Sequence, residues 1–315
     1  MELEDKQNVT VFFIQGLTDF PKLQFTIFLL FLLSYVIVFL GNITIFVVIL
    51  HDPHLHTPMY IFLMNLSLTD IGNTSNVLPK MLTILLTQRK TISFEGCMTQ
   101  LVMFISLTVT EVLILSAMAY DRYVAICHPL HYFILMSLRY TFILIVASWT
   151  IGFLDTTGHA VLVSKLSFCE THLIDHVFCD LTTLLKISCS DTFKVEMLTF
   201  IEGGIFTVPA FLLTFISYIF IVYTVLKIKS SGGRRKAFST CASHLTCVTM
   251  YYGTLIPLYM RPTSSYSPKQ DKFFSLLYIV LIPMLNPVIY TLKNQDIKEA
   301  MKRLMNKIHF CDAHF

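Results

Sequence analysis

Charged residues are scarce in this sequence. Lysine, arginine, aspartate and glutamate together make up 14% of the 315 residues, whereas hydrophobic residues make up 55%. A soluble domain carries about 25% charged residues, so this composition excludes an ordinary soluble fold. The net charge is only +3 and gives no indication of a nucleic acid partner.

Motifs typical of metal centres, enzymes and targeting signals are missing as well. The eight cysteines form no CxxC pair, and neither HExxH nor GxSxG occurs, so we expect no enzyme and no transition-metal site. Residues 1–22 mix acidic and basic side chains instead of placing a basic stretch before an apolar one. We therefore expect no cleavable signal peptide, and the first apolar segment would serve as an uncleaved insertion signal.

Long apolar runs dominate what is present. No charged residue occurs from Phe25 to Leu50, and about 20 apolar residues in a helix cross the ~30 Å core of a bilayer. Seven such helices are predicted, at 24–50, 58–86, 97–127, 139–163, 194–228, 237–260 and 271–292. The second and seventh are less apolar than the others, and polar groups at that depth must face protein or a water-filled cavity.

The fold class that follows is an all-α membrane protein, a single seven-transmembrane helix bundle in the lipid bilayer. One domain covers residues 1–315, with a tail at 1–23, the bundle at 24–292 and a second tail at 293–315. A short amphipathic helix is expected from about Asp296 to Lys307. Ile297, Met301 and Leu304 share one face there, which suits the membrane surface.

Three features predict a plasma-membrane protein with its N-terminus outside and its C-terminus in the cytoplasm. This orientation places 12 Lys/Arg in cytoplasmic segments and 10 outside, with Lys80 inside a helix, in the direction of the positive-inside rule. Asn8 begins a glycosylation sequon in the first tail. Four cysteines lie at the outer end, where disulfides form, and allow three pairings: Cys97, Cys169, Cys179 and Cys189.

Five strings then make the sequence specific. They are LHTPMY at 55–60, MAYDRYVAIC at 118–127, SY at 217–218, KAFSTCASHL at 236–245 and PMLNPVIY at 283–290. In this order, each at the end or in the body of the appropriate helix, they resemble the odorant receptors, a family of rhodopsin-like G-protein-coupled receptors. The short first tail and the loop spacing resemble the family's tetrapod-type branch. The resemblance implies binding of small, mostly apolar volatile molecules, activation of a stimulatory heterotrimeric G protein and a rise in cAMP.

The resemblance also implies a set of switch and coupling residues: Asp121, Arg122, Tyr123, Tyr218, Asn286, Pro287 and Tyr290. Arg122 is a permanent cation near the inner membrane face, so it needs a partner, and its neighbour Asp121 is the expected one in the resting state. Activation would free Arg122 to meet the G protein, while Tyr218 and Tyr290 swing inward. The alternatives are a structural ion pair at a helix end and a passive kink at Pro287.

Helical geometry connects the two ends of the third helix. Phe104 and Arg122 are 18 residues apart, a whole number of turns, so they share one face roughly 27 Å apart. Thr108, Glu111, Leu115 and Met118 lie near the same stripe. A plain helix interface would have the same apolar spacing but no need of Glu111, so the stripe favours a relay from ligand to effector.

Asp70 and Glu111 are two acids deep in neighbouring helices. Two buried carboxylates repel, so one is protonated or a cation lies between them. The resemblance implies a sodium ion near Asp70 and Glu111, with Asn42 and Asn286 completing its oxygen shell. The alternative is a neutral, hydrogen-bonded pair without an ion, and no other cofactor is expected.

The resemblance places the ligand pocket in the outer half of the third, fifth and sixth helices, with one residue from the seventh. The predicted lining is Phe104, Ile105, Thr108, Val109, Glu202, Phe206, Tyr252, Leu255, Ile256, Tyr259 and Ile279. Glu202 is either a polar anchor in this pocket or faces outer water or a loop lysine, Lys165 or Lys186. Phe104 stands where amine-hormone receptors carry an aspartate, which argues against a monoamine ligand of that type.

The cysteine pairing implied by the family is Cys97 with Cys179 and Cys169 with Cys189. Two rival functions are disfavoured by the sequence. A transporter or channel would show internal repeats or charge-lined pores, and no repeat is visible. A receptor for a peptide hormone would carry a longer first tail.

Overall fold

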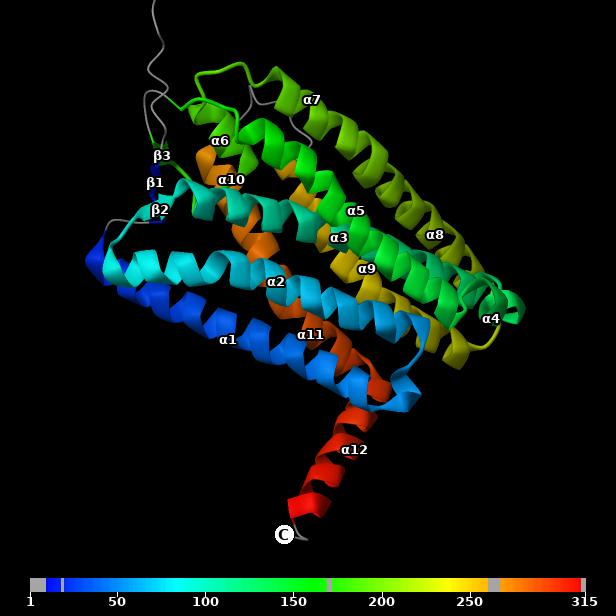
Figure 1. The fold of residues 1–315 in the computed structure, drawn as a ribbon. Helices are drawn as coiled ribbons and strands as arrows, with labels where there is room; N and C mark the ends of the chain where they lie inside the picture. Colours follow the sequence, from blue (N-terminus) through cyan, green and yellow to red (C-terminus); the bar gives the residue numbers. More distant parts are fainter. Residues whose placement is uncertain (1–9, 18–19, 169–171, 260–266, 313–315) are drawn as a thin grey trace, which may run out of the picture.

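Seven long helical spans run side by side through the part of the chain that the computed structural model describes, residues 10–17, 20–168, 172–259 and 267–312 (Figure 1). This arrangement confirms the predicted helix bundle. The first four spans are α1 (Pro21–His51), α2 (Pro58–Thr87), α3 (Phe94–Cys127) and α5 (Leu138–Val163). The fifth joins α7 (Phe193–Glu202) to α8 (Val208–Leu226), the sixth is α9 (Ser231–Tyr259), and the seventh joins α10 (Pro268–Leu276) to α11 (Ile282–Lys293).

The fifth and seventh spans each contain a π-helical turn that the sequence did not predict. These turns, η3 (Gly203–Thr207) and η5 (Leu277–Leu281), come just before Pro209 and Pro283. In each, the next N–H bonds a carbonyl five residues back, Val208 to Gly203 and Ile282 to Leu277. A proline has no N–H and crowds the preceding turn, and the wider turn accommodates one extra residue there.

Five of the spans are long and apolar enough to cross a membrane by length and composition: Leu23–His51, Phe94–Cys127, Leu138–Val163, Phe193–Leu226 and Pro268–Thr291. Among the described residues, α2 and α9 fall short of this apolarity. The second helix is therefore less apolar, as predicted. The same prediction for the seventh helix is wrong, because the seventh span is apolar enough and the sixth is not. The polar residues of α2 face the protein. Asn65 accepts a hydrogen bond from Trp149 Nε1 at 3.0 Å, and Asn76 donates to the Gln100 carbonyl at 2.8 Å.

A small sheet closes one end of the bundle, called the sheet end below. The strand β1 (Val11–Ile14) pairs antiparallel with β2 (Thr91–Ser93) and parallel with β3 (Leu173–Ile174). The sequence predicted only a tail before the first helix. Phe12 and Ile14 alternate inward and are fully buried, so this stretch acts as a strand with one apolar face.

The loop that carries β3 is fixed at several points. The helix α6 (Leu181–Ile187) follows it, and a disulfide joins Cys179 to Cys97 of α3, with their Cα atoms 5.4 Å apart. Asp175 forms an ion pair with Lys272 of α10 at 2.6 Å. His176 packs edge-on against Phe178, and burial lowers the pKa of His176, which keeps this imidazole neutral.

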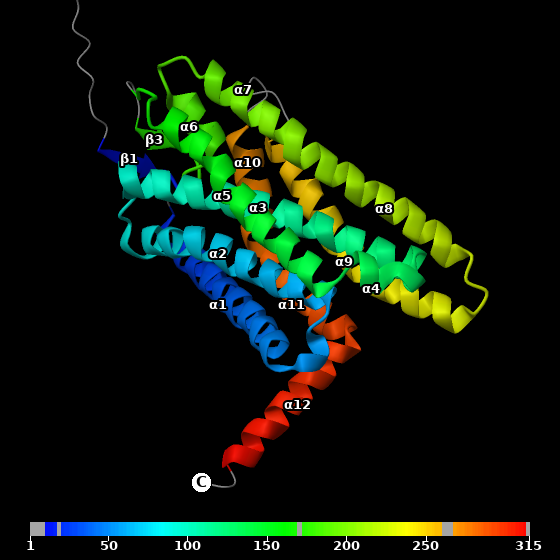
Figure 2. The ribbon, with the colours of Figure 1, turned by 45° about the vertical axis from the view of Figure 1, so that its right-hand side comes forward.

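The opposite end of the bundle carries the short segments η1 (Pro53–Leu55), η2 (Pro129–His131) and α4 (Tyr132–Leu135), and the last helix, α12 (Gln295–Asp312). In both ribbon views α12 leaves the bundle in a different direction from the seven spans (Figures 1 and 2). Its Ile297 is fully buried, as the predicted amphipathic pattern requires. The sixth span begins here at Ser231, six residues before the predicted start at 237.

Arg303 anchors α12 to the connection between α1 and α2. Its Nε and Nη2 atoms each lie 2.8 Å from Asp52 Oδ2. Burial opposes ionisation of Asp52, but hydrogen bonds from His54 and Arg303 outweigh it and lower the pKa of Asp52 to about 2.

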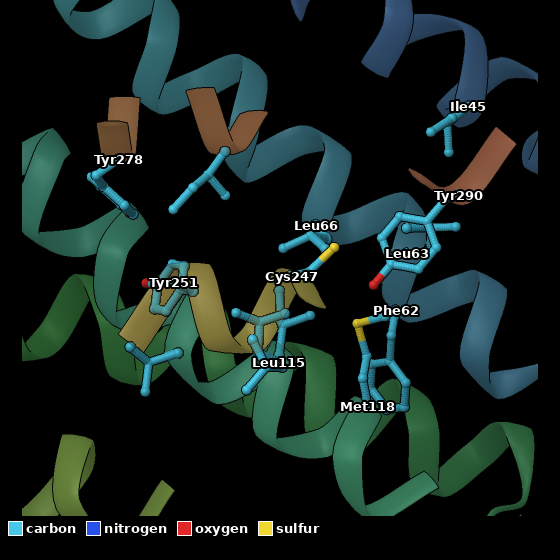
Figure 3. Packing of buried hydrophobic residues seen from close by; sticks show 14 of the residues in the cluster. Ile45, Phe62, Leu63, Leu66, Leu115, Met118, Cys247, Tyr251, Tyr278 and Tyr290 are labelled. Atoms are coloured by element: carbon cyan, nitrogen blue, oxygen red, sulfur yellow. The ribbon is translucent and has the colours of Figure 1, made fainter. Parts of the chain in front are cut away.

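The interior between the two ends is filled by apolar and aromatic side chains. Figure 3 shows Tyr251 and Tyr278 close together in one part of this core and Tyr290 beside Leu63 in another. Leu115 and Met118 of the predicted α3 stripe are buried in the same cluster. The stripe therefore faces the interior, as its spacing predicted.

Candidate functional site

A cavity of about 110 Å³ lies in the half of the bundle toward the sheet end. Each helix around it contributes residues three, four or seven positions apart, which form one helical face. Its lining residues are Leu101, Phe104, Ile105, Thr108, Val109 and Val112 of α3, Asp155 and His159 of α5, Asp180 and Leu181 of the loop and α6, Thr199, Glu202, Gly203, Phe206 and Thr207 of the fifth span, and Leu255 and Tyr259 of α9.

Eight of the eleven predicted pocket residues line this cavity: Phe104, Ile105, Thr108, Val109, Glu202, Phe206, Leu255 and Tyr259. Tyr252, Ile256 and Ile279 are not among the described lining residues. Ile256 is one residue on from Leu255, a rotation of about 100°, and its side chain is 40% exposed on the outside of the bundle.

The other two residues lie in the packed interior instead. Tyr252 is one turn deeper than Leu255 and packs edge-on against Phe211 of α8, with ring centroids 5.1 Å apart. Ile279 is fully buried in the π-helical turn of the seventh span. Packing, rather than cavity lining, is thus the observed role of both side chains.

The wall formed by α5 and α7 is polar, a feature that sequence reasoning missed except for Glu202. His159 is 2% exposed, and its Nδ1 atom lies 3.1 Å from Glu202 Oε2. Asp155, one turn before His159, also faces the cavity. Among the described residues Glu202 contacts this histidine and no loop lysine, which favours the pocket alternative for Glu202.

Asp180 carries a third carboxylate, at the end of the cavity toward the loop. It accepts hydrogen bonds from the Tyr259 hydroxyl at 2.8 Å and the Thr182 N–H at 3.0 Å, and it also contacts the Thr182 hydroxyl. These donors stabilise its charge. The lining residues in the described part of the chain include no lysine or arginine.

Thr108 connects the cavity with the deeper core. Its carbonyl accepts a hydrogen bond from the Tyr251 hydroxyl at 2.9 Å, and its Oγ1 lies 3.1 Å from the Tyr278 hydroxyl. Tyr278 in turn donates to Glu111 Oε2 at 2.8 Å. A side chain on the cavity wall therefore contacts the tyrosine that holds the buried acid of α3.

Four buried side-chain oxygens of α1, α2 and α11 have no hydrogen-bond partner among the described residues. Asp70 Oδ2 accepts from Asn286 Nδ2 at 2.9 Å, but Asp70 Oδ1, Asn286 Oδ1, Asn42 Oδ1 and Asn73 Oδ1 are unpaired. Hard cations prefer carboxylate and amide oxygens. Asp70, Asn42 and Asn286 thus fit a sodium ion, whereas Glu111 is held by the Tyr278 hydroxyl and by Asn73 Nδ2 at 3.4 Å.

The predicted ion pair lies at the other end of α3. Arg122 Nε donates to Asp121 Oδ2 at 2.9 Å, and the Tyr132 hydroxyl donates to Asp121 Oδ1 at 2.8 Å. Burial and the Asp121 carboxylate raise the pKa of Tyr132, which keeps its hydroxyl protonated as a donor. Asp121 itself is fully buried, so this acid, arginine and tyrosine form one closed group.

The other predicted switch residues lie in α3, α8 and α11. The Tyr218 hydroxyl lies 2.6 Å from His244 Nδ1, which joins α8 to α9, and the two rings stack. Tyr123 bonds His128 at 3.0 Å. Pro287 lies inside α11, one residue after Asn286, and Tyr290 is buried. The roles of these residues in switching stay predictions.

The structure contains the predicted Cys97–Cys179 disulfide. Cys189 is also disulfide-bonded, but its predicted partner Cys169 lies outside the described residues, so that pairing stays a prediction. Asn8, the predicted glycosylation site, lies outside them too.

Comparisons with known proteins agree over nearly the whole chain. Residues 31–307 match the family model described as "Olfactory receptor". The chain is 47% identical over 307 residues to "Olfactory receptor 5AR1" of Mus musculus, covering 98% of this chain and 99% of that protein. It is 46% identical over 307 residues to "Olfactory receptor 5I1" of Homo sapiens, covering 97% and 98%.

A solved structure gives the same fold at much lower sequence similarity. The crystal structure of squid rhodopsin matches with a TM-score of 0.72 at 16% identity, covering 94% of this chain and 89% of that one. At this identity the likeness concerns the fold alone, a rhodopsin-like bundle of seven transmembrane helices.

Proposed function

Because this chain belongs to the olfactory receptor family, we propose that it binds a small, mostly apolar organic molecule in the cavity between α3, α5, α7 and α9. Binding of this ligand activates a stimulatory heterotrimeric G protein, and the G protein raises cAMP. The observation that carries the proposal is the layout of α3. Thr108 lines the cavity, and Arg122, 14 residues and roughly 21 Å further along, forms the ion pair at the opposite end.

The proposed orientation in the plasma membrane puts the sheet end outside and α4 and α12 in the cytoplasm. A disulfide belongs in an oxidising compartment, and Cys97–Cys179 lies at the sheet end. In this orientation Arg122 opens toward the cytoplasm, where a G protein binds, and the cavity lies in the outer half of the bundle.

The proposed mechanism starts at Thr108. A ligand in the cavity contacts the same residue whose Oγ1 lies 3.1 Å from the Tyr278 hydroxyl, so ligand binding changes the position of Tyr278 and its bond to Glu111. The change favours a second arrangement of the helices, in which Arg122 leaves Asp121 and Tyr218 leaves His244. Both ligand and G protein then stabilise the same state, which is the requirement for coupling between two sites.

A sodium ion near Asp70 is a further part of the proposal, with Glu111, Asn42 and Asn286 nearby. The unpaired oxygens of Asp70, Asn42 and Asn286 support it. The ion would balance the charge of one of the two buried carboxylates, and a proton that of the other. Glu111→Gln should weaken the dependence of signalling on external sodium while surface expression persists; a sodium response equal to that of the parent contradicts a shared ion.

Cells expressing the full chain test the main proposal. A broad panel of volatile organic molecules is applied with cAMP as the readout, and Arg122→Ala serves as the comparison at matched surface expression. We expect at least one ligand to raise cAMP in the parent, and Arg122→Ala to abolish the rise while ligand-induced thermal stabilisation is retained. A full cAMP response from Arg122→Ala contradicts the role of Arg122, and a response through another messenger alone contradicts stimulatory coupling.

A further inference from the structure

The polar wall of the cavity, defined as Asp155, His159 and Glu202, has an unbalanced charge. Two of its three side chains are acids, and the described lining residues offer no lysine or arginine to either. Asp155 has no recorded hydrogen-bond or ion-pair partner within the described residues. An ionised carboxylate in a largely apolar site must find a proton, water or a cation.

Hydrogen bonding in this wall favours a proton on His159 Nε2. The Thr199 hydroxyl donates its only proton to the Val195 carbonyl at 2.9 Å, so at 3.0 Å from His159 Nε2 it acts as the acceptor. His159 Nε2 therefore carries a proton. A neutral imidazole would then present the bare lone pair of Nδ1 to Glu202 Oε2, 3.1 Å away.

Two acceptors at this distance repel unless one of them carries a proton. One proton, on either Glu202 or His159, makes that pair neutral. His159 Nδ1 forms no hydrogen bond among the described residues, so Glu202 is not held by this contact. The remaining charge of the wall is the single negative charge of Asp155, which no described residue balances.

We propose that the activating ligand is a small aliphatic monoamine whose ammonium group binds Asp155 and Glu202, with its hydrocarbon chain against α3. One ammonium and one shared proton balance the two carboxylates. The inference rests on the proposed function of the cavity and names the ligand class. Amine-hormone receptors carry an aspartate at the position of Phe104 in α3. In this chain the acids that bind the ammonium group lie on the opposite wall, in α5 and α7.

The remainder of the cavity limits the size and character of the ligand. Phe104, Ile105 and Val109 provide an apolar surface facing the polar wall. A cavity of 150 Å³ in another protein holds benzene, which has six non-hydrogen atoms, so about 110 Å³ admits a molecule of roughly four or five. The expected ligand is a short primary amine, protonated at neutral pH, with a compact hydrocarbon chain.

The experiment compares propylamine and butylamine with propanol and butanol, which have the same length but no charge. Each is tested for cAMP in cells expressing the full chain and for thermal stabilisation of the purified receptor. We expect the amines to act at concentrations at least tenfold lower than the alcohols. Asp155→Asn should raise the effective amine concentration at least tenfold and leave that of the alcohols within twofold.

Two further variants control for structural damage. Glu196→Gln removes an acid from the same helix as Glu202, but Glu196 bonds Thr192 and is not among the lining residues, so both ligand classes should act on it as on the parent. Asp155→Glu keeps the charge and should retain part of the amine preference. If Asp155→Asn weakens amines and alcohols equally, Asp155 has only a structural role and the inference is wrong.

The two proposals fail in different ways. If alcohols or other neutral odorants raise cAMP and amines do not, the amine inference is wrong while the receptor function stands. If amines stabilise the purified receptor in an Asp155-dependent way and no ligand raises cAMP, the binding site stands and the proposed coupling is wrong.

Discussion

Gly152 is the position where one added methyl group should disturb the cavity most directly. It faces α3 from α5, and a Cβ placed on it would lie 2.6 Å from the Ser106 carbonyl oxygen and closer still to Thr110 Oγ1. The carbonyl belongs to the backbone of α3 and cannot rotate away. An ordinary contact of 3.4 Å requires the two helices to separate by about 0.8 Å, the difference from 2.6 Å.

Three contributions determine the stability of Gly152→Ala. Overpacking costs about 1–3 kcal/mol. Separating the helices also weakens the Ser106–Thr156 hydrogen bond of 2.7 Å, a contribution of about 1 kcal/mol. Alanine regains about 1 kcal/mol of helix propensity over glycine. The free energy of unfolding should therefore fall by about 1–3 kcal/mol, and ligand potency should fall because Asp155 shifts relative to Ile105 on the facing wall.

Gly253→Ala is the matched control. Gly253 lies inside α9, and a Cβ there would meet nothing within 4 Å, so the same substitution brings only the gain in propensity. Thermal unfolding of both variants in detergent, with surface expression alongside, measures the difference. If Gly152→Ala unfolds at the same temperature as Gly253→Ala or above it, the close packing of α3 and α5 at Gly152 does not make an added methyl group destabilising, and the reasoning is wrong.

Three other predictions follow from single contacts. Cys97→Ala removes the disulfide at the sheet end and should cost about 2–5 kcal/mol, seen as loss of surface expression and a lower unfolding temperature. Tyr132→Phe removes the hydrogen bond to Asp121 and should raise basal cAMP at matched expression; an unchanged basal level contradicts a resting-state restraint. Asp52 has a pKa lowered from 3.8 to about 2, so its pairing with Arg303 contributes stability above pH 3.8 that is lost as the pH falls through about 2. The protection of α12 amides from hydrogen exchange, corrected for the intrinsic rate, should accordingly be constant between pH 5 and 8. Exchange in α12 should be faster in Asp52→Asn than in the parent.

The helix bundle could be predicted because lipid imposes strict rules on the sequence. Each span must be about 20 apolar residues long, and polar groups within it must face protein. The α3 stripe was predicted from a spacing of 18 residues alone, and the structure shows Thr108 on the cavity and Leu115 and Met118 in the core. Periodicity therefore identified the face of a helix that borders the interior.

The elements that were missed depend on contacts distant in sequence. The strand at Val11–Ile14 exists because β2 and β3 supply its partners, from residues about 80 and 160 positions later. The π-helical turns at Gly203–Thr207 and Leu277–Leu281 precede prolines, a signal visible in the sequence but without a fixed outcome. Which residues of a helix reach a cavity depends on depth as well as face, which is why Tyr252 was placed in the pocket although it lies one turn below it.

Asp155 and His159 were the clearest sequence features that indicated the cavity but were not among the predicted pocket residues. They are one turn apart in a span that is otherwise uncharged from 140 to 163, and an ionisable residue within a membrane helix is by default a candidate functional residue. The predicted pocket drew on the third, fifth, sixth and seventh helices, so it left out both residues of α5.

Asp155 and His159 also change how a ligand would act, because the polar wall belongs to α5 and α7 whereas the ion pair belongs to α3. An ammonium bound by Asp155 would pull on α5 directly beside Gly152, where α5 touches the α3 backbone. The contact that makes Gly152 intolerant of a methyl group thus connects the proposed ammonium site on α5 to the helix that carries Arg122.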